Sequence, residues 1–128
     1  MIEPQGRRPN KTLNIEKQIF PNTYTGPITD TETLTIHNKS GNTITITQPQ
    51  VVGRSTGAPI PEMTVSTPAN LTIANGGTMT FDVTYSDNID GTGGRFAQGK
   101  MEITWSDGTT TCPFGPIWVD GSFWINPP

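Results

Sequence analysis

Apolar and polar side chains alternate with a period of two along most of this 128-residue chain. The most regular run spans residues 78–85, where every second residue is apolar, namely Met79, Phe81, Val83 and Tyr85. Successive side chains of a β-strand point to opposite faces, so this alternation predicts a strand with one buried face. Shorter runs of the same kind lie at 13–15, 33–37, 43–47, 51–52, 63–65, 71–73, 101–105 and 117–119.

Clusters of Gly, Pro and Asn separate these runs and predict turns between them. The two longest predicted loops cover residues 21–27, which include Tyr24, and residues 86–94. No long window has the apolar spacing of a helix, which repeats about every 3.6 residues. The chain is therefore predicted to be all-β, with an immunoglobulin-like antiparallel β-sandwich of about seven strands.

The two ends of the chain differ in pattern from its middle. Residues 1–11 are polar and carry Pro4 and Pro9, which predicts a flexible N-terminal arm. The alternating pattern predicts one sandwich domain over residues 12–125, and residues 126–128 form a short Pro-rich tail. One domain also fits the length of the chain, because domains usually contain roughly 100–150 residues.

The composition supports the predicted fold and excludes some classes of partner. The chain has 22 Thr and 13 Ile but only three Leu, and β-branched residues favour strands. Its net charge is −3 with no long basic block, so we expect no nucleic-acid partner. No apolar stretch is long enough for a membrane helix, and no secretory signal is recognisable. A single Cys and a single His predict no metal site or other cofactor.

The order of strands and turns resembles that of a known family. The segments that carry the resemblance are LTIHNKSGNTITIT, MTVSTPANLTIANGGTMTFDVTY, GKMEITWSDG and PIWVDG, within residues 13–122. They resemble the ASPM- and Hydin-type immunoglobulin-like domains, relatives of the major-sperm-protein fold. Ser86-Asp87-Asn88 departs from the pattern, because many members have a proline there. The resemblance implies binding and scaffolding without catalytic residues, and it extends to stand-alone modules that decorate phage capsids and tails.

One motif points formally to hydrolase chemistry. Residues 53–57 read Gly-Arg-Ser-Thr-Gly, which fits the G-x-S-x-G pattern of a nucleophile elbow. That elbow must open a helix and needs a later histidine, whereas Pro59 and Pro61 follow here and His37 lies upstream. We therefore predict that the chain is not an enzyme.

Two further candidates have simpler explanations. Asp87, Asn88 and Asp90 beside Gly91 are similar to a calcium loop, but the spacing puts Ile89 at a ligand position. A polar turn accounts better for these residues. Cys112, the only cysteine, is interpreted as a small apolar side chain.

The aromatic C-terminal stretch is the strongest functional candidate. Trp118 alternates with two apolar neighbours and should point outward, and Phe123 and Trp124 are placed beyond the predicted last strand. Exposed Trp and Phe side chains mark partner surfaces, and Arg7 and Arg8 could dock on an acidic surface. The partner-binding residues predicted from sequence are therefore Arg7, Arg8, Trp118, Phe123 and Trp124. The alternative is that the C-terminal stretch folds back and caps the sandwich.

The leading functional hypothesis is a non-enzymatic structural protein of a phage virion. It would decorate or cement the capsid, or associate with the tail, and bind capsid or tail proteins through its terminal segments and exposed aromatics. Homo-oligomerisation is compatible with this role, and cytoplasmic or cell-surface localisation are the alternatives to the virion. The second hypothesis is a carbohydrate-binding or adhesion module, with Trp118, Trp124 and Tyr24 as a stacking platform for sugar rings.

Overall fold

The computed structural model describes residues 11–19, 23–91 and 93–125, and within them the regular elements are all strands. No helix in these ranges is long and apolar enough to cross a membrane. The predicted all-β class is confirmed. The strands are β1 (Lys11–Ile19), β2 (Tyr24–His37), β3 (Ile44–Ile46), β4 (Val52–Gly53), β5 (Met63–Val65), β6 (Thr72–Ile73), β7 (Thr78–Gly91), β8 (Gly94–Ser106) and β9 (Thr111–Ile125).

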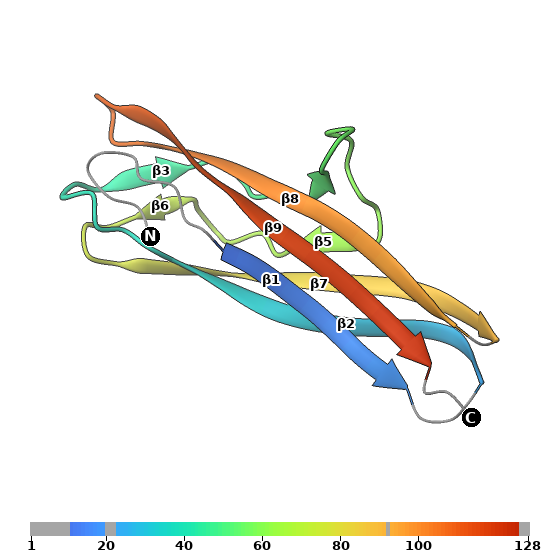
Figure 1. The fold of residues 1–128 in the computed structure, drawn as a ribbon. Helices are drawn as coiled ribbons and strands as arrows, with labels where there is room; N and C mark the ends of the chain where they lie inside the picture. The colour runs from blue at the N-terminus through green and yellow to red at the C-terminus, as the bar shows by residue number, and fades with distance from the viewer. Residues whose placement is uncertain (1–10, 20–22, 92, 126–128) are drawn as a thin grey trace.

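The strands form two sheets that lie face to face (Figure 1). The larger sheet has the order β1-β9-β8-β3-β6, with β4 also paired to β8, and the smaller sheet has the order β2-β7-β5. The described pairs are antiparallel except β1 and β9, which run in the same direction. This arrangement is the predicted immunoglobulin-like sandwich, and four of its strands have three residues or fewer.

The core lies between the sheets and follows the period-two pattern. On β7, Phe81, Val83 and Tyr85 are completely buried, and Met79 is half-buried against the core. These residues face inward because they alternate with polar residues that remain in contact with water. The isoleucines of β3 behave in the same way, with Thr45 exposed between the buried Ile44 and Ile46.

The long strands extend through both segments that the sequence assigned to loops. β2 begins at Tyr24 and pairs with β7 along its whole length, from Tyr24 opposite Gly91 to His37 opposite Thr78. The predicted loops at 21–27 and 86–94 are therefore wrong where β2, β7 and β8 occupy them. The physical reason is that β2 and β7 supply each other with backbone partners, and the continued alternation buries Ile89.

The predicted terminal segments fall mostly outside the described residues. Residues 1–10 and 126–128 are among those that the structure does not describe. Lys11, which the sequence assigned to the arm, is the first residue of β1 and lies opposite Ile117 of β9. The boundaries of the arm and of the tail remain predictions, apart from this correction at Lys11.

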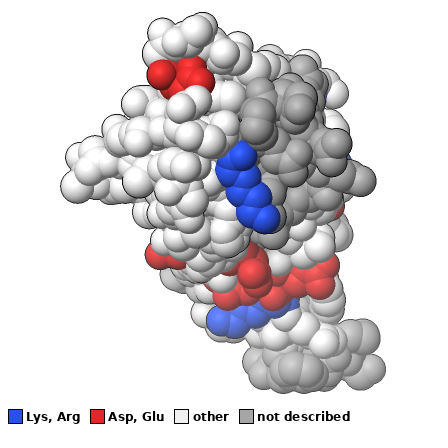
Figure 2. All heavy atoms as spheres, turned by 90° about the vertical axis from the view of Figure 1, so that its left-hand side faces the viewer, with Lys and Arg blue, Asp and Glu red and all other residues white. Residues whose placement is uncertain are grey.

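Charged side chains do not form one continuous field on the part of the surface that Figure 2 shows. Figure 2 faces the end of the sandwich near β3 and β6, and it shows small separate groups of acidic and basic residues on a largely uncharged surface. Two described ion pairs join Arg54 to Asp120 and Lys100 to Glu102. Both pairs involve the larger sheet, because Lys100 and Glu102 lie on β8 and Asp120 lies on β9.

Candidate functional site

Strands β8, β9 and β1 present one continuous outer surface, here called the β8–β9–β1 face. Directly paired residues of neighbouring strands place their side chains on the same side of a sheet. The pairing therefore aligns Phe96 with Ser122, Lys100 with Trp118 and Thr12 with Trp118. The outward positions are Phe96, Gln98, Lys100, Trp118, Asp120, Ser122, Trp124, Thr12, Asn14, Glu16 and Gln18.

Two aromatic side chains mark one end of this face. Phe96 is 75% exposed and is the large apolar side chain most open to water among the described residues. Trp124 is half-buried and points outward, because its neighbours Phe123 and Ile125 are buried. Phe96 pairs directly with Ser122, and Trp124 lies two positions after Ser122 on β9. Phe96 and Trp124 are therefore diagonal neighbours on the two strands, and such neighbours lie about 7–8 Å apart.

The strand position opposite Trp124 carries no side chain, because Gly94 occupies it. A Cβ added to Gly94 would lie 3.3 Å from the Cβ of Trp124 and 2.4 Å from the backbone oxygen of Phe123. Glycine at this position therefore allows the close approach of the two strands, and it places no side chain of β8 directly opposite Trp124. We call Phe96, Trp124 and their neighbours Glu16, Gln98 and Ser122 the aromatic patch.

Trp118, at the other end of the face, is engaged by Arg54. The guanidinium carbon of Arg54 lies 4.9 Å from the centroid of the Trp118 ring, within cation–π range. Arg54 also forms an ion pair with Asp120, and its Nε donates a hydrogen bond of 3.2 Å to the backbone oxygen of Gly99. One side of the Trp118 ring is therefore covered from within the chain, whereas Phe96 is open.

The structure separates the residues that the sequence grouped as a partner surface. Trp118 faces outward, as predicted. Trp124 also faces outward, but it lies within β9 and not beyond the last strand. Phe123 is completely buried and stacks on Tyr85 with ring centroids 4.3 Å apart, so its assignment as an exposed residue is wrong. The reason is that β9 continues to Ile125, which gives Phe123 the inward parity of the other core residues of that strand. Arg7 and Arg8 lie outside the described residues.

The predicted sugar platform of Trp118, Trp124 and Tyr24 is not assembled. Tyr24 belongs to β2 of the other sheet, where its side chain packs against the core. Its hydroxyl donates a hydrogen bond of 3.2 Å to the backbone oxygen of Pro27. Tyr24 is therefore a packing residue at the sandwich edge and does not extend the aromatic patch.

Phe96 is the functional candidate that sequence reasoning missed. It follows the segment 86–94, for which the sequence predicts a loop, so no predicted strand includes it. The signal was nevertheless present, because extending the alternation of Met101, Ile103 and Trp105 backwards gives Phe96 the outward parity of the exposed Glu102. An apolar residue at an outward position of a strand is the informative exception to the pattern.

The motif Gly53–Gly57 begins at the last residue of the two-residue strand β4 and forms a tight turn. The amide of Gly57 donates a hydrogen bond of 3.0 Å to the backbone oxygen of Gly53, and Gly57 has a φ of 68°. Within residues 11–19, 23–91 and 93–125 no helix follows Ser55. His37 is exposed at the end of β2. The geometry of a nucleophile elbow is therefore missing from this turn.

The acidic residues similar to a calcium loop lie along β7 and do not converge. Consecutive side chains of a strand point to opposite faces, so Asp87 and Asn88 diverge. Asp87 accepts a hydrogen bond of 2.9 Å from the hydroxyl of Tyr85. No group of three or more His, Cys, Asp or Glu in the described part of the chain is placed to hold a metal ion. Cys112 is half-buried and packs against the core.

Two titrating groups have shifted pKa values, and both shifts arise from the fold. Burial raises the pKa of Tyr85 well above its usual value, and the hydrogen bond to Asp87 adds to this effect. The backbone amide of Thr110 lowers the pKa of Asp107, assisted by the amide of Thr109. Tyr85 belongs to the core stack and Asp107 to the turn between β8 and β9, so neither shift marks the aromatic patch.

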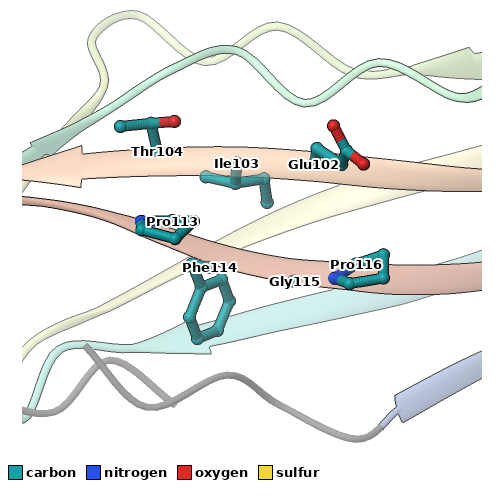
Figure 3. A pocket seen from close by; sticks show the side chains of 7 residues that line it. All are labelled: Glu102, Ile103, Thr104, Pro113, Phe114, Gly115 and Pro116. Atoms are coloured by element: carbon teal, nitrogen blue, oxygen red, sulfur yellow. The ribbon is translucent and has the colours of Figure 1, made fainter. Parts of the chain in front are cut away.

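A small pocket of about 180 Å³ lies on β8 and β9 where their register shifts between Met101 and Ile103 (Figure 3). Figure 3 shows Glu102 and Thr104 on one side of the strands and Phe114 on the other. Glu102 supplies the charge in this lining, and its carboxylate lies 3.1 Å from the ammonium group of Lys100. The pocket thus results from the strand irregularity and offers one already paired carboxylate.

Comparison with known proteins bears on the fold. No family model matches the sequence, and no curated protein matches it. A solved structure of an ASH / PapD-like domain of human CEP192, its PapD-like domain 7, is similar with a TM-score of 0.55. That likeness covers 94% of this chain and 84% of the CEP192 domain, at 14% identity. The chain has a PapD-like, immunoglobulin-like fold.

This fold agrees with the one that the resemblance to major-sperm-protein-like domains implies. At 14% identity the likeness establishes the arrangement of strands and leaves the partner to be inferred from the surface of this chain. In this PapD-like sandwich, the aromatic patch lies on the outer face of the larger sheet, near the start of β8 and the end of β9. It is the best candidate for a functional site.

Proposed function

We propose that the chain is a non-enzymatic binding protein and that the aromatic patch is its contact surface. The observation that carries this proposal is the pair of Phe96 and Trp124 on the outer face of a sheet. Phe96 keeps 75% of its surface exposed although the same sheet buries other large apolar side chains. Exposed aromatic residues are enriched at the energetic centres of binding surfaces, which supports a binding role.

The sheet holds the patch in a fixed position. Phe96 lies on β8 and Trp124 on β9, and the two strands are paired from Gly94 opposite Trp124 to Ser106 opposite Thr111. The inward side of β9 is anchored by Phe123 in its stack with Tyr85. A contact surface on such paired strands is already ordered before binding, so little conformational entropy is lost when a partner is bound.

We place this binding protein on a phage virion, as a capsid decoration or cement protein or a tail-associated protein. The support for this setting is the resemblance to stand-alone immunoglobulin-like modules of phage particles. In this proposal the terminal segments, including Arg7 and Arg8, attach the chain to capsid or tail proteins, and the sandwich projects from them. Segments that become ordered on docking can tie a domain to neighbouring subunits.

Occupancy on purified particles tests the attachment. A variant that lacks residues 1–10 keeps Lys11 and therefore the complete β1, so it should fold like the full chain. We expect this deletion to reduce the number of copies bound per particle, measured by quantitative mass spectrometry. Phe96→Ala and Trp124→Ala are measured in the same assay, to test whether the aromatic patch contributes to particle occupancy. Full occupancy in the deletion variant would refute attachment through the arm, and failure of the intact chain to bind particles would refute the virion setting.

A further inference from the structure

We infer that the aromatic patch binds a neutral glycan. This inference rests on the proposed function, because it names the ligand class of the same contact surface. The argument uses the composition of the β8–β9–β1 face, its charge and the placement of its hydrogen-bonding groups. A second protein and a nucleic acid are the competing ligands, and each requires a different surface.

The outward positions of the face are polar apart from its aromatic rings. Its eleven outward positions include three aromatic residues and no Leu, Ile, Val or Met. The central part of a protein interface is a packed apolar patch that excludes water and is depleted in charge. Here the rings of Phe96 and Trp124 are surrounded by amide, hydroxyl and carboxylate groups. Aromatic rings surrounded by polar groups can bind a ligand that has one apolar side and polar groups along its edge.

A sugar ring is such a ligand. One of its sides carries C–H groups that can stack on an aromatic ring, whose face is electron-rich, while its hydroxyl groups project from the edge. The hydroxyl groups both donate and accept hydrogen bonds, as amide side chains do. Gln98 and Ser122 lie within one or two positions of the aromatic rings, and their side chains form no hydrogen bond in the described part of the chain. They are therefore available to bond with the hydroxyl groups of a stacked sugar.

The charge of the outward side chains disfavours an anionic polymer. Both basic groups on it are already paired, Arg54 with Asp120 and Lys100 with Glu102. Glu16 lies opposite Ser122, in the same row as Phe96, and it forms no ion pair in the described part of the chain. A nucleic acid, or a glycan with sulfate or phosphate groups, requires unpaired basic residues. An unpaired carboxylate beside the rings repels such a ligand but accepts hydrogen bonds from neutral sugars.

Arg54 sets the limit of the site along the sheet. It covers Trp118 and ties that ring to Asp120, so the open part of the face ends between Asp120 and Ser122. Phe96 and Trp124 are diagonal neighbours, which leaves stacking positions for one or two sugar residues. The site therefore binds a short stretch of a glycan, and the affinity of a single protein copy for the glycan should be modest.

Native affinity electrophoresis tests this inference. The full chain is run in gels that contain mannan, laminarin or dextran as neutral probes, and chondroitin sulfate as the anionic probe. We expect retardation by at least one neutral polysaccharide and none by chondroitin sulfate. Phe96→Ala and Trp124→Ala should each weaken binding about tenfold, the factor that corresponds to ~1.4 kcal/mol. A glycan array extends the test to a wider set of neutral and sulfated sugars.

Thr31→Ala is the matched control, because Thr31 is exposed on the other sheet, where its hydroxyl pairs with that of Thr84 at 2.9 Å. It should bind like the unmodified chain, and a thermal melt confirms that each variant is folded. The inference is overturned if no neutral glycan binds in gels or on the array, or if Phe96→Ala and Trp124→Ala leave binding unchanged. It is also overturned if chondroitin sulfate is preferred.

The particle assay separates this failure from that of the proposed function. If Phe96→Ala and Trp124→Ala reduce particle occupancy while no glycan binds, the patch contacts protein, and the glycan inference alone fails. If neither occupancy nor glycan binding responds to these substitutions, the patch is not a contact surface and both proposals fail. Glycan binding that depends on the patch, with occupancy unaffected, supports the patch as a site that faces away from the particle.

Discussion

Phe123 and Trp124 are adjacent on β9, and substituting each by Ala should have very different effects on stability. Phe123 is completely buried and stacked on Tyr85, whereas Trp124 lies on the outer face. Phe123→Ala removes a core ring and leaves a cavity between the sheets. Trp124→Ala removes side-chain atoms that are already in partial contact with water.

The expected magnitudes differ enough to decide between the two environments. Truncating a buried Phe to Ala costs about 3–5 kcal/mol, because the transfer free energy is lost and a cavity remains. This loss is a large fraction of the free energy of unfolding of a globular domain, which is typically about 5–15 kcal/mol. Trp124→Ala should cost about 1 kcal/mol or less, as substitutions away from the core usually do.

Urea denaturation followed by circular dichroism measures both values. With a slope of roughly 2 kcal/mol per molar urea, Phe123→Ala should lower the midpoint by about 2 M. Trp124→Ala should lower it by about 0.5 M or less. Phe123→Leu keeps most of the apolar volume and should fall between the two variants. The corresponding loss in melting temperature for Phe123→Ala is roughly 10–20 °C.

Equal destabilisation by Phe123→Ala and Trp124→Ala would refute this account of β9. A larger loss for Trp124→Ala would mean that the strand presents its opposite face to the core. In that case Phe123, and not Trp124, would belong to the outer surface, and the aromatic patch would have to be redefined.

Three further predictions concern the core and two titrating groups. Gly121→Ala should reduce stability strongly in a thermal melt, because the added Cβ would lie 2.4 Å from Tyr85 Cδ2 and 2.6 Å from Met63 Cε. Asp107 has a lowered pKa in the fold, so its contribution is present above its unfolded pKa of about 3.9 and is lost as the pH falls through the folded value. The urea midpoint of the unmodified chain should therefore exceed that of Asp107→Asn at pH 7 and approach it at low pH. Tyr85 has a raised pKa, so its neutral form stabilises the fold below about pH 10, and this contribution is lost as the pH rises further. Tyr85→Phe should show a smaller alkaline loss of stability than the unmodified chain.

The alternating pattern was sufficient to predict most of the fold. Phe81, Val83 and Tyr85 were assigned to the core from their spacing, and all three are completely buried. The outward direction of Trp118 followed in the same way from its apolar neighbours. These predictions succeed because the side-chain parity of a strand is a local property of the backbone.

Strand ends were predicted less well, and this affected the candidate site. The segment 86–94 is rich in Asp, Asn and Gly, so its local composition favours a loop. In the fold, β7 remains extended through Asp90 because β2 pairs with it along this stretch. The loop predicted at 86–94 left Phe96 without a strand, and a similar underestimate of strand length at the C-terminus placed Phe123 on the surface.

The sequence by itself determined the class of the protein, the parity of its strands and the identity of most core residues. Only the tertiary structure decided which strands are neighbours, and therefore that Phe96 and Trp124 share one face while Tyr24 lies in the other sheet. It also decided that Arg54, distant in sequence, covers Trp118. The physical reason is that alternation is fixed by the geometry of consecutive residues, whereas a surface is assembled by pairing between distant strands, which no local pattern encodes.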